Sequence, residues 1–286
     1  MANDSFLIKA HAKINWALNV LSRRSDGYHI LDMLVQRIDL ADELVFGHAG
    51  DLQLEVTNAP ADLDTRNNLV MKAALALKQA TAYQGGARIT LKKRIPSQAG
   101  LGGGSADAAA ALVGLNQLWD TGLTIAQLQA IGIKLGADVP PCLCQGLMRV
   151  TGIGEEITSI KGAREYPLLL IQPGKGLSTA EVFKAYDLEN KTGAADLDLA
   201  ANALISSNLN QLDQVCKNQL QPVASRMLPA IDQAVADLLA HGALFAQMTG
   251  SGSVVFGVFE SPEKVKQAHS VLRDRWPVCI LSKTLG

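Results

Sequence analysis

The feature that most constrains the fold is a glycine-rich segment between a predicted strand and a predicted helix. It spans residues 96–119, reads PSQAGLGGGSADAAAALVGLNQLW, and has four glycines within the five positions from Gly100 to Gly104. Glycines let the backbone adopt positive φ and approach a ligand closely, so neighbouring amide N–H groups can face one anion. The N-terminus of the following helix adds unsatisfied donors and the positive end of the helix dipole. The segment therefore predicts a site for a di- or triphosphate, with a purely structural turn as the alternative.

This loop matches neither of two common phosphate-binding motifs. No Gly-Lys-Ser/Thr sequence closes it, as a Walker A motif requires. No acidic residue that could bind a ribose follows it in a clear βαβ unit, as the dinucleotide fingerprint requires. Ser105 is expected either to cap the helix or to reach a phosphate-bound Mg²⁺. Asp107 is expected in the first helical turn, where a carboxylate suits the helix dipole.

Lys13 and Asp138 are the charged residues that best suit phosphoryl transfer. Lys13 lies among apolar residues in AHAKINWAL, so it is either a buried lysine that needs a partner or a surface lysine on an edge strand. Asp138 lies in GADVP, where a carboxylate either accepts a proton from an attacking hydroxyl or serves as a turn or cap residue. A pairing of the two would offset the cost of burying the lysine and would keep the carboxylate ionised.

Tyr28 and His29 follow a predicted Asp-Gly turn in RRSDGYHILD. An aromatic ring beside an imidazole can stack on a base and hydrogen-bond to its edge. A half-buried tyrosine next to an ordinary surface histidine is the alternative. A later run of small residues, MTGSGSVVFG at residues 248–257, is either a plain hairpin loop or a place where the backbone approaches a ligand.

The order of predicted elements indicates an α+β fold of two domains, at residues 1–160 and 161–286. Strict strand–helix alternation is absent, which argues against a doubly wound sheet or a TIM barrel. We expect a hairpin formed by residues 42–48 and 51–58, and a helix capped by Asn67. Other expected elements are a strand at residues 5–20, helices near residues 124–135, 178–186, 208–218 and 228–241, two strands around TGSGS, a helix opened by Ser261-Pro262, and a final strand in WPVCILS.

Composition argues against several functional classes. The 286 residues carry 26 Lys and Arg against 27 Asp and Glu, a formal net charge of −1, whereas proteins that bind nucleic acid non-specifically are usually more basic. No apolar run is long enough to span a bilayer, and Lys9, His11 and Lys13 interrupt any signal-peptide core. The four cysteines fit a reducing compartment. We therefore expect a cytoplasmic protein with no membrane or nucleic-acid partner, and the oligomeric state is left open.

Five motifs in one order resemble the GHMP kinase superfamily. They are Lys-Ile-Asn near the start, Asp-Gly-Tyr-His, Pro-x-x-x-Gly-Leu-Gly-Gly-Gly-Ser, Gly-Ala-Asp-Val-Pro and a late Thr-Gly-Ser-Gly. Within the superfamily, the chain resembles the kinases that phosphorylate the 2-hydroxyl of 4-(cytidine 5′-diphospho)-2-C-methyl-D-erythritol in non-mevalonate isoprenoid precursor biosynthesis. The resemblance implies the two-domain GHMP kinase fold, of class α+β, with the active site in the inter-domain cleft, and ATP and Mg²⁺ as cofactors.

The resemblance also assigns roles to individual residues. Lys13 and Asp138 would be the catalytic pair, with Asp138 as the base on the substrate hydroxyl. The small-molecule cytidylyl substrate would be bound by Asn15, Tyr28, His29 and Thr179. The ATP phosphates would be bound by Pro96, Ser97, Gln98, Ala99, Gly100, Leu101, Gly102, Gly103, Gly104, Ser105 and Ala106.

Two positions depart from the family pattern. Some members have more glycine at the front of the loop, so Gln98 and Ala99 are expected to stiffen it. Val35 stands where some members have an aromatic residue at the cytosine pocket, so stacking on one face only is expected. The remaining alternatives are a GHMP kinase for homoserine, mevalonate or a sugar, a non-catalytic nucleotide-binding module, and an RNA-binding α+β domain.

Overall fold

The chain forms two compact units that interleave along the sequence. The structure is a computed structural model that describes residues 5–58, 67–189 and 193–286. Unit 1 takes residues 1–12, 40–95 and 102–144, and unit 2 takes residues 13–39, 96–101 and 145–286. These compact units are discontinuous in sequence and do not test the predicted boundary between two continuous domains. The boundary after residue 160 therefore stays a prediction.

Two long strands contribute residues to both units, namely β1 (Phe6–Arg23) and β2 (His29–Ala49). Unit 1 also contains β3 (Leu52–Thr57), α1 (Leu69–Thr81), β4 (Gly86–Lys92), α2 (Gly103–Leu118), α3 (Ile125–Gly132) and α4 (Val139–Cys142). Unit 2 also contains β5 (Leu147–Gly152), β6 (Glu156–Ile160), β7 (Pro167–Gln172), α5 (Thr179–Tyr186), α6 (Leu197–Ser206), η1 (Leu209–Gln211), α7 (Leu212–Val215), α8 (Gln221–Met227), α9 (Ala230–Ala240), β8 (Phe245–Met248), β9 (Val255–Val258), α10 (Pro262–Leu272) and β10 (Val278–Lys283).

In unit 1, β4 lies between β2 and β3. It pairs antiparallel with β2 and parallel with β3, so the predicted hairpin of residues 42–48 and 51–58 is wrong. A parallel pair needs a crossover connection, and α1 lies in the connection between β3 and β4. The pairing also needs a close approach at Gly86, where a Cβ would lie 2.3 Å from the carbonyl carbon of Asp51. These partners are distant in sequence, so local patterning favoured the wrong one.

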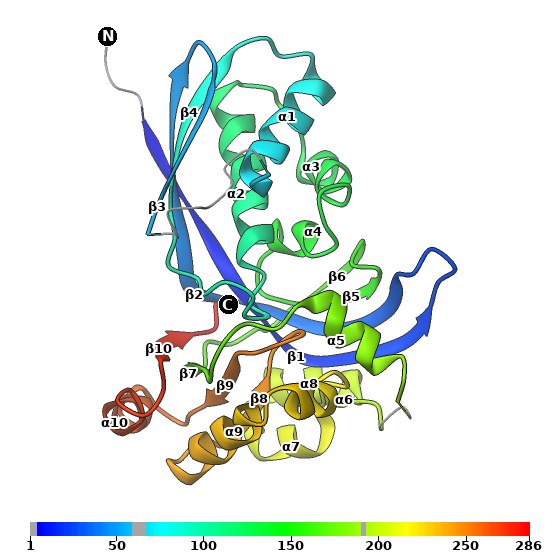
Figure 1. Cartoon of the computed structure of the whole chain (residues 1–286), viewed down its shortest axis with the longest axis vertical. Helices are drawn as coiled ribbons and strands as arrows, with labels where there is room; N and C mark the ends of the chain where they lie inside the picture. Colours follow the sequence, from blue (N-terminus) through cyan, green and yellow to red (C-terminus); the bar gives the residue numbers. More distant parts are fainter. Residues whose placement is uncertain (1–4, 59–66, 190–192) are drawn as a thin grey trace. The chain divides into compact units, whose positions relative to one another are not determined.

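The core of unit 1 lies between its strands and its helices, which stand on the same side of the strands in Figure 1. The predicted stripe of α2 is confirmed, because Ala108, Leu112, Leu115 and Trp119 are all buried. Gly114 lets α2 pack closely, since a Cβ there would lie 2.4 Å from the Phe46 ring. The helix α1 is capped one residue later than predicted. Its N-cap is Asn68, whose side chain accepts a hydrogen bond from the Val70 amide.

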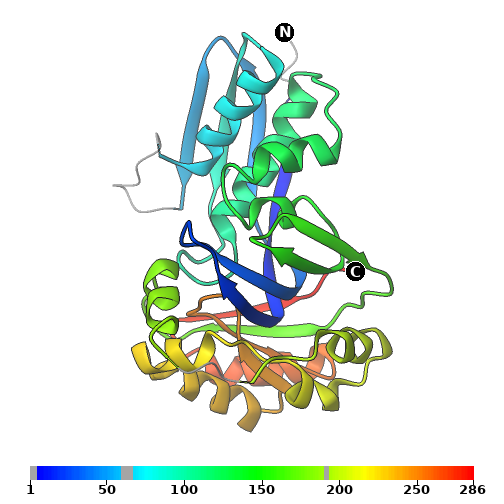
Figure 2. The same cartoon turned by 90° about the vertical axis from the view of Figure 1, so that its right-hand side faces the viewer.

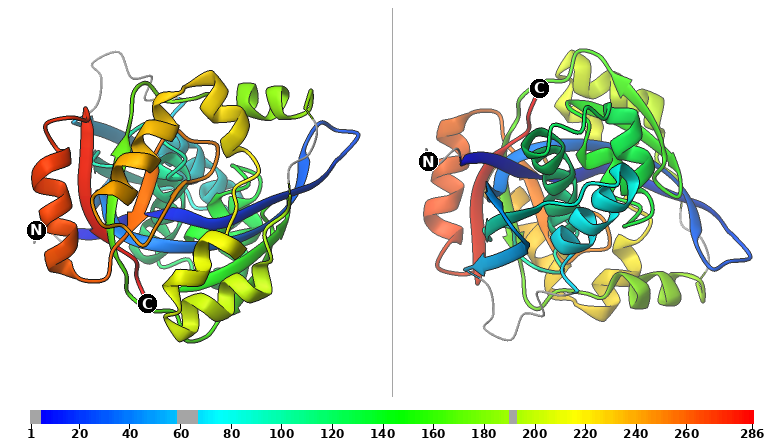
Figure 3. Two further views of the ribbon diagram at one scale, coloured as in Figure 1. Left: turned by 90° about the horizontal axis from the view of Figure 1, so that it is seen from below. Right: turned by 90° about the horizontal axis from the view of Figure 1, so that it is seen from above.

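In unit 2, a four-stranded sheet has the order β10-β7-β9-β8, and all its pairs are antiparallel. The helix α9 packs on β8 and β9, and α10 packs on β7 and β10; Figure 3 shows α10 beside β10. The predicted strands around TGSGS are confirmed as β8 and β9. The predicted start of α10 is also confirmed, with the Ser261 side chain accepting from the Lys264 amide.

The predicted helix over residues 208–218 is confirmed only in part. Residues 209–215 form the short 3₁₀ helix η1 and the short α-helix α7, after which the chain runs extended beside β1. There the Leu18 amide donates to the Lys217 carbonyl at 2.9 Å, and the Gln219 amide donates to the Leu18 carbonyl at 3.0 Å. This bridge takes the backbone groups that a continuing helix would need.

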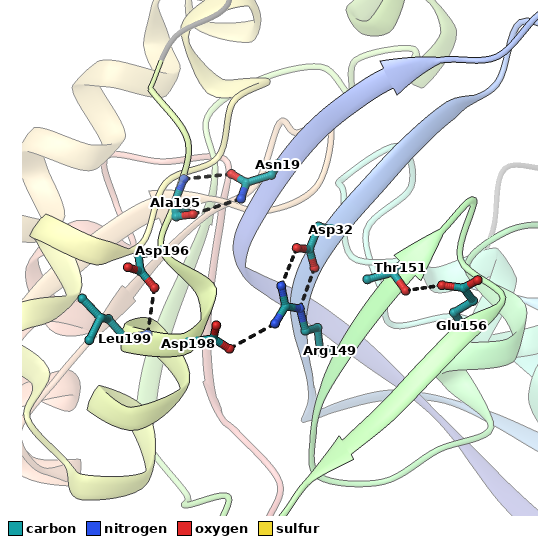
Figure 4. A network of polar contacts seen from close by, with 9 residues as sticks. All are labelled: Asn19, Asp32, Arg149, Thr151, Glu156, Ala195, Asp196, Asp198 and Leu199. Atoms are coloured by element: carbon teal, nitrogen blue, oxygen red, sulfur yellow. Dashed lines mark hydrogen bonds and ion pairs between the residues drawn. The ribbon is translucent and has the colours of Figure 1, made fainter.

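Polar side chains join α6 and its N-terminal approach to strands β1, β2 and β5 within unit 2 (Figure 4). Arg149 donates to both carboxylate oxygens of Asp32, at 2.9 and 2.7 Å, and its other nitrogen lies 3.0 Å from Asp198. Asn19 exchanges two hydrogen bonds with the backbone of Ala195. Such bidentate pairs fix geometry better than single contacts do. Within residues 5–58, 67–189 and 193–286, no helix has both the length and the hydropathy needed to cross a bilayer.

Candidate active site

The glycine-rich loop divides between the two units, with Leu101 in unit 2 and Gly102 in unit 1. Gly100 and Gly102 have φ values of +74° and +69°, which side-chain-bearing residues rarely adopt. A Cβ on Gly100 would also lie 2.1 Å from the carbonyl oxygen of Thr249. The loop therefore needs glycine at position 100 both for its backbone conformation and for a close approach.

The front of the loop, residues 96–101, lies against the run of small residues at 249–254. The Val254 amide donates to the Ala99 carbonyl at 3.1 Å, and the Thr249 hydroxyl lies 3.3 Å from the Gly100 carbonyl. This run is therefore both a loop between paired strands and a place of close backbone approach. Gln98 has a φ of +50°, an uncommon conformation for a residue with a side chain.

The back of the loop begins α2, with Gly102 as the N-cap and Gly103 as the first helical residue. No side chain caps this helix, so the expected capping role of Ser105 is wrong. Ser105 is instead the third helical residue. The first turn contains no acidic residue, so Asp107 lies beyond the position where it was expected. A helix N-terminus without a side-chain cap keeps its amide donors for another acceptor.

Behind this half of the loop, Lys93 lies between two buried carboxylates. Its ammonium is 2.5 Å from Oδ2 of Asp107 and also contacts Asp42. Asp42 is fully buried and accepts from the Ile95 amide at 2.8 Å. Asp107 is 3% exposed, and its Oδ1 has no hydrogen-bond partner among the described residues. A Cβ built on Gly103 would lie 3.8 Å from the Lys93 ammonium, which places this cluster directly behind the helix start.

The cluster carries strongly perturbed charges. Burial, with a contribution from Asp42, raises the pKa of Asp107 to about 7, although Lys93 acts in the opposite direction. Burial alone would lower the pKa of Lys93, but the carboxylates of Asp107 and Asp42 raise it overall. A charged group is stabilised in a dry site by opposite charges, and two carboxylates that share one lysine also repel each other. Sequence reasoning missed this cluster because its three members come from distant elements.

Lys13 and Asn15 are buried in unit 2, with exposed fractions of 5% and 1%. The alternative of a surface lysine is therefore wrong. The Lys13 ammonium donates to the Asn15 side-chain oxygen at 2.7 Å, and the Lys13 amide donates to the Leu101 carbonyl at 3.0 Å. The Asn15 amide donates to the Thr249 hydroxyl at 2.9 Å. Unit 2 thus brings Lys13, Asn15, the loop front and Thr249 together.

Asp138 lies in unit 1, at the N-cap position of the four-residue helix α4. Its carboxylate makes no capping hydrogen bond. A capping role therefore does not explain why an aspartate occupies this position. Pro140 and Pro141 are buried and belong to the helix, which fixes the backbone of this turn. The pairing of Lys13 with Asp138 stays a prediction.

Tyr28 and His29 lie where β2 begins, and Figure 2 shows this hairpin tip, in blue, next to α5, in lime. Tyr28 is 58% exposed, so its ring is accessible. The His29 imidazole stacks on Phe183 with a centroid distance of 4.6 Å. Its Nε2 lies 2.7 Å from Oδ1 of Asp187, which excludes an ordinary surface histidine. Val35, expected near the base, is buried.

Thr179, Phe183 and Asp187 share one face of α5 and its C-cap. Thr179 is the first helical residue, and its hydroxyl lies 2.9 Å from the Ser251 hydroxyl. Phe183 and Asp187 were missed by sequence reasoning. Their signal was their spacing, because positions four and eight residues after Thr179 fall on the same helical face.

The chain resembles known proteins over more than nine-tenths of its length. Residues 68–146 match the model of the GHMP kinase N-terminal domain, and residues 195–278 match that of the GHMP kinase C-terminal domain. The chain is 37% identical over 266 residues to 4-diphosphocytidyl-2-C-methyl-D-erythritol kinase of Alkaliphilus metalliredigens, covering 93% of this chain and 91% of the relative. The chain belongs to the GHMP kinases. As a GHMP kinase it is an ATP-dependent enzyme, and the predicted family and fold class are confirmed.

Solved structures of GHMP kinases have the same fold. A crystal structure of 4-(cytidine 5′-diphospho)-2C-methyl-D-erythritol kinase matches with a TM-score of 0.83 and 32% identity, covering 98% of this chain and 100% of the other. Homoserine kinase from Cytophaga hutchinsonii matches with a TM-score of 0.76 at 19% identity, covering 99% and 95% of the two chains. The second likeness concerns the fold alone, because GHMP kinases with different acceptors share it.

Proposed function

We propose that this GHMP kinase transfers the γ-phosphoryl group of ATP to the 2-hydroxyl of 4-(cytidine 5′-diphospho)-2-C-methyl-D-erythritol in non-mevalonate isoprenoid precursor biosynthesis. The observation that carries the proposal is the similarity, over more than nine-tenths of the chain, to kinases named for that compound. The accessible Tyr28 ring beside His29 supports a substrate that carries a base. With four cysteines that form no disulfide, the proposed location is the cytoplasm.

The glycine-rich loop is the proposed phosphate-binding element. Residues 96–106 combine positive-φ glycines with a helix N-terminus that no side chain caps. Amide donors at a helix N-terminus bind phosphate oxygens favourably. They stabilise most strongly the negative charge that develops in the transition state. Phosphoryl transfer needs mainly alignment and charge stabilisation, which is what this loop supplies in the proposal.

Lys13 and Asp138 are the proposed catalytic pair. Asp138 orients the acceptor hydroxyl and accepts its proton as the bond to phosphorus forms. Lys13 places a positive charge next to the reacting groups, and its bond to Asn15 holds the ammonium in one position.

Mg²⁺ is proposed to bind mainly to the phosphates of ATP rather than to protein side chains. The described residues contain no group of three His, Cys, Asp or Glu side chains that could hold a metal ion. Mg²⁺ in kinases is usually bound by substrate phosphates, waters and one or two protein groups, so such a group is not needed. The Ser105 hydroxyl, at the start of α2, is the proposed protein group beside the ion. When bound, the ion would offset phosphate charge.

The cytidylyl substrate is proposed to bind along the β1–β2 hairpin and α5. Tyr28 stacks on the cytosine, and His29 hydrogen-bonds to its edge. Thr179 and Asn15 bind nearer to the reacting alcohol. His29 contacts Asp187 at the C-terminal end of α5, and Thr179 is the first residue of this helix. This separation supports an elongated substrate.

The test is an acceptor panel with γ-labelled ATP. The panel contains the cytidylyl methylerythritol, homoserine, mevalonate and a hexose, each with wild type, Asp138→Ala and the control Asp274→Ala, whose carboxylate is 84% exposed. We expect label transfer only to the cytidylyl compound. Asp138→Ala should lose about 10²–10⁴-fold in kcat with ATP affinity within several-fold of wild type. Transfer to another acceptor, or full turnover in Asp138→Ala, would contradict the proposal.

Tyr28→Ala tests the substrate site separately from the ATP site. We expect the KM for the cytidylyl substrate to rise by about tenfold or more, because stacking on a base contributes about 1–3 kcal/mol. The KM for ATP should stay near the wild-type value, and Tyr28→Phe should restore most of the loss. Equal effects on both substrates would count against the cytosine assignment.

A further inference from the structure

We propose that Asp187 is a positioning residue that fixes the His29 ring so that it selects cytosine over uracil. The inference rests on the proposed function, in which His29 contacts the base. It assigns a role in specificity to a carboxylate outside the five sequence motifs.

The geometry that carries the inference lies entirely within unit 2. Asp187 follows α5 as its C-cap residue, and its Oδ1 lies 2.7 Å from Nε2 of His29. Its other oxygen lies 3.2 Å from the guanidinium of Arg23. The carboxylate is therefore held from two sides, and the side that faces His29 is fixed.

A second contact fixes the plane of the imidazole. The ring stacks on Phe183 at an interplanar angle of 23°, and Phe183 lies one helical turn before Asp187. The same helix therefore sets both the plane of the ring and the direction of Nε2. The His29 side chain keeps 9% of its surface exposed, so a ligand can reach part of the ring.

The hydrogen bond to Asp187 decides which nitrogen carries the proton in the neutral ring. A carboxylate accepts but does not donate, so Nε2 carries the hydrogen and Nδ1 becomes an acceptor. No partner of Nδ1 is found in the part of the chain that the structure describes. The ring can thus offer one acceptor to the base.

An acceptor at this place distinguishes the two pyrimidines. Cytosine carries an amino group, a donor, at the position where uracil carries a carbonyl oxygen, an acceptor. Nδ1 can accept a hydrogen bond from the amino group but would face the uracil oxygen as a second acceptor. A site that hydrogen-bonds one group of its substrate rejects an analogue that leaves the hydrogen-bonding group of the site without a partner.

The kinetic test compares the cytidylyl substrate with the uridine analogue of the same alcohol in wild type, Asp187→Ala and Asp187→Asn. Asp213→Asn, at an exposed carboxylate of the same unit, is the control. In Asp187→Ala we expect kcat/KM for the cytidylyl substrate to fall about tenfold, the equivalent of one lost hydrogen bond. The value for the uridine analogue should stay within twofold, as should the KM for ATP. Asp187→Asn, which can still accept from Nε2, should recover part of the loss.

The spectroscopic test needs no substrate. Long-range ¹H–¹⁵N correlation spectra of the ¹⁵N-histidine-labelled protein, with His29 assigned by His29→Gln, report which ring nitrogen carries the proton. Wild type should show the Nε2–H tautomer, and Asp187→Ala should show a mixture. If wild type fails to phosphorylate the cytidylyl compound but shows the Nε2–H tautomer, the proposed function fails while the positioning by Asp187 stands.

Three outcomes would overturn the inference. One is an Asp187→Ala protein with unchanged discrimination between the two pyrimidines. Another is an equal loss for both substrates, which would indicate a merely structural role. The third is a His29 tautomer that does not respond to removal of the carboxylate.

Discussion

The two halves of the glycine-rich loop are held in place by different kinds of interaction. The front, residues 96–101, is held by neutral groups: backbone bonds from Val254 and Lys13, and the Thr249 hydroxyl. The back begins α2, and behind it lie one lysine and two buried carboxylates. One half therefore depends on close approach of backbones, and the other depends on a balance of charge.

This difference indicates which kind of change should destabilise each half of the loop. Neutral contacts at short range fail when an atom is added, because the neighbouring backbone cannot move away. A buried charge cluster fails when its lysine is removed or when a buried carboxyl group loses its proton, because the added or remaining negative charge then lacks compensation. Predictions about the two halves therefore separate by the kind of change that is made.

The largest effect is expected for Lys93→Ala, which leaves two buried carboxylates without their lysine. Breaking a buried ion pair costs about 3–5 kcal/mol in free energy of unfolding. Urea unfolding followed by circular dichroism measures it. The control is Lys92→Ala, because Lys92 is the adjacent but exposed lysine. A loss no greater than that of the control would contradict the account of the back half.

A smaller effect is expected for Gly100→Ala in the front half. The added Cβ would lie 2.1 Å from the Thr249 carbonyl oxygen and would sit at a φ of +74°. Strain of this kind costs about 1–3 kcal/mol, and we also expect a raised KM for ATP. Gly242→Ala is the matched control, because its φ is +94° but its Cβ would meet no atom within 4 Å. If both variants lose equally, the close approach contributes nothing beyond the backbone conformation.

The smallest effect, when measured between pH 6 and 7, is a pH dependence confined to the back half. The folded-state pKa of Asp107 is raised from 3.8 to about 7, so between these values the folded protein holds a proton that the unfolded chain releases. Stability therefore falls as pH rises through this window and levels off above about 7, with a loss of about 1 kcal/mol between pH 6 and 7. Asp107→Asn should remove this slope, whereas Thr249→Val, a front-half change, should leave it. Unfolding curves at several pH values decide between these outcomes, and an unchanged slope in Asp107→Asn would refute the assignment.

Sequence reasoning succeeded where the determining contacts are local. The loop glycines, the buried stripe of α2 and the start of α10 follow from residues only a few positions apart. The sequence alone left two alternatives for Lys13, and its burial settles the choice. For the loop glycines, α2 and α10, one short segment contains the information.

The errors share the opposite property. The strand β3 pairs with β4 rather than with its neighbour β2, and the extended segment near Asn218 bridges to β1. The cluster of Asp42, Lys93 and Asp107 collects side chains from three separate segments of the chain. Pairings between distant segments are set by the packing of the whole unit, which periodicity in a single sequence does not record. Phe183 and Asp187 are intermediate cases, because helical spacing from Thr179 would have indicated them.

The length of helix α5 has a consequence for the acceptor in the proposed binding mode. It has eight residues, and at about 1.5 Å per residue it measures about 12 Å. Its first residue contacts Ser251, and the residue after its last turn contacts His29. In the proposed binding mode, this fixed length separates the contact to the base from the contact near the reacting alcohol. An acceptor with a shortened or extended phosphate bridge would then reach one end of α5 and miss the other.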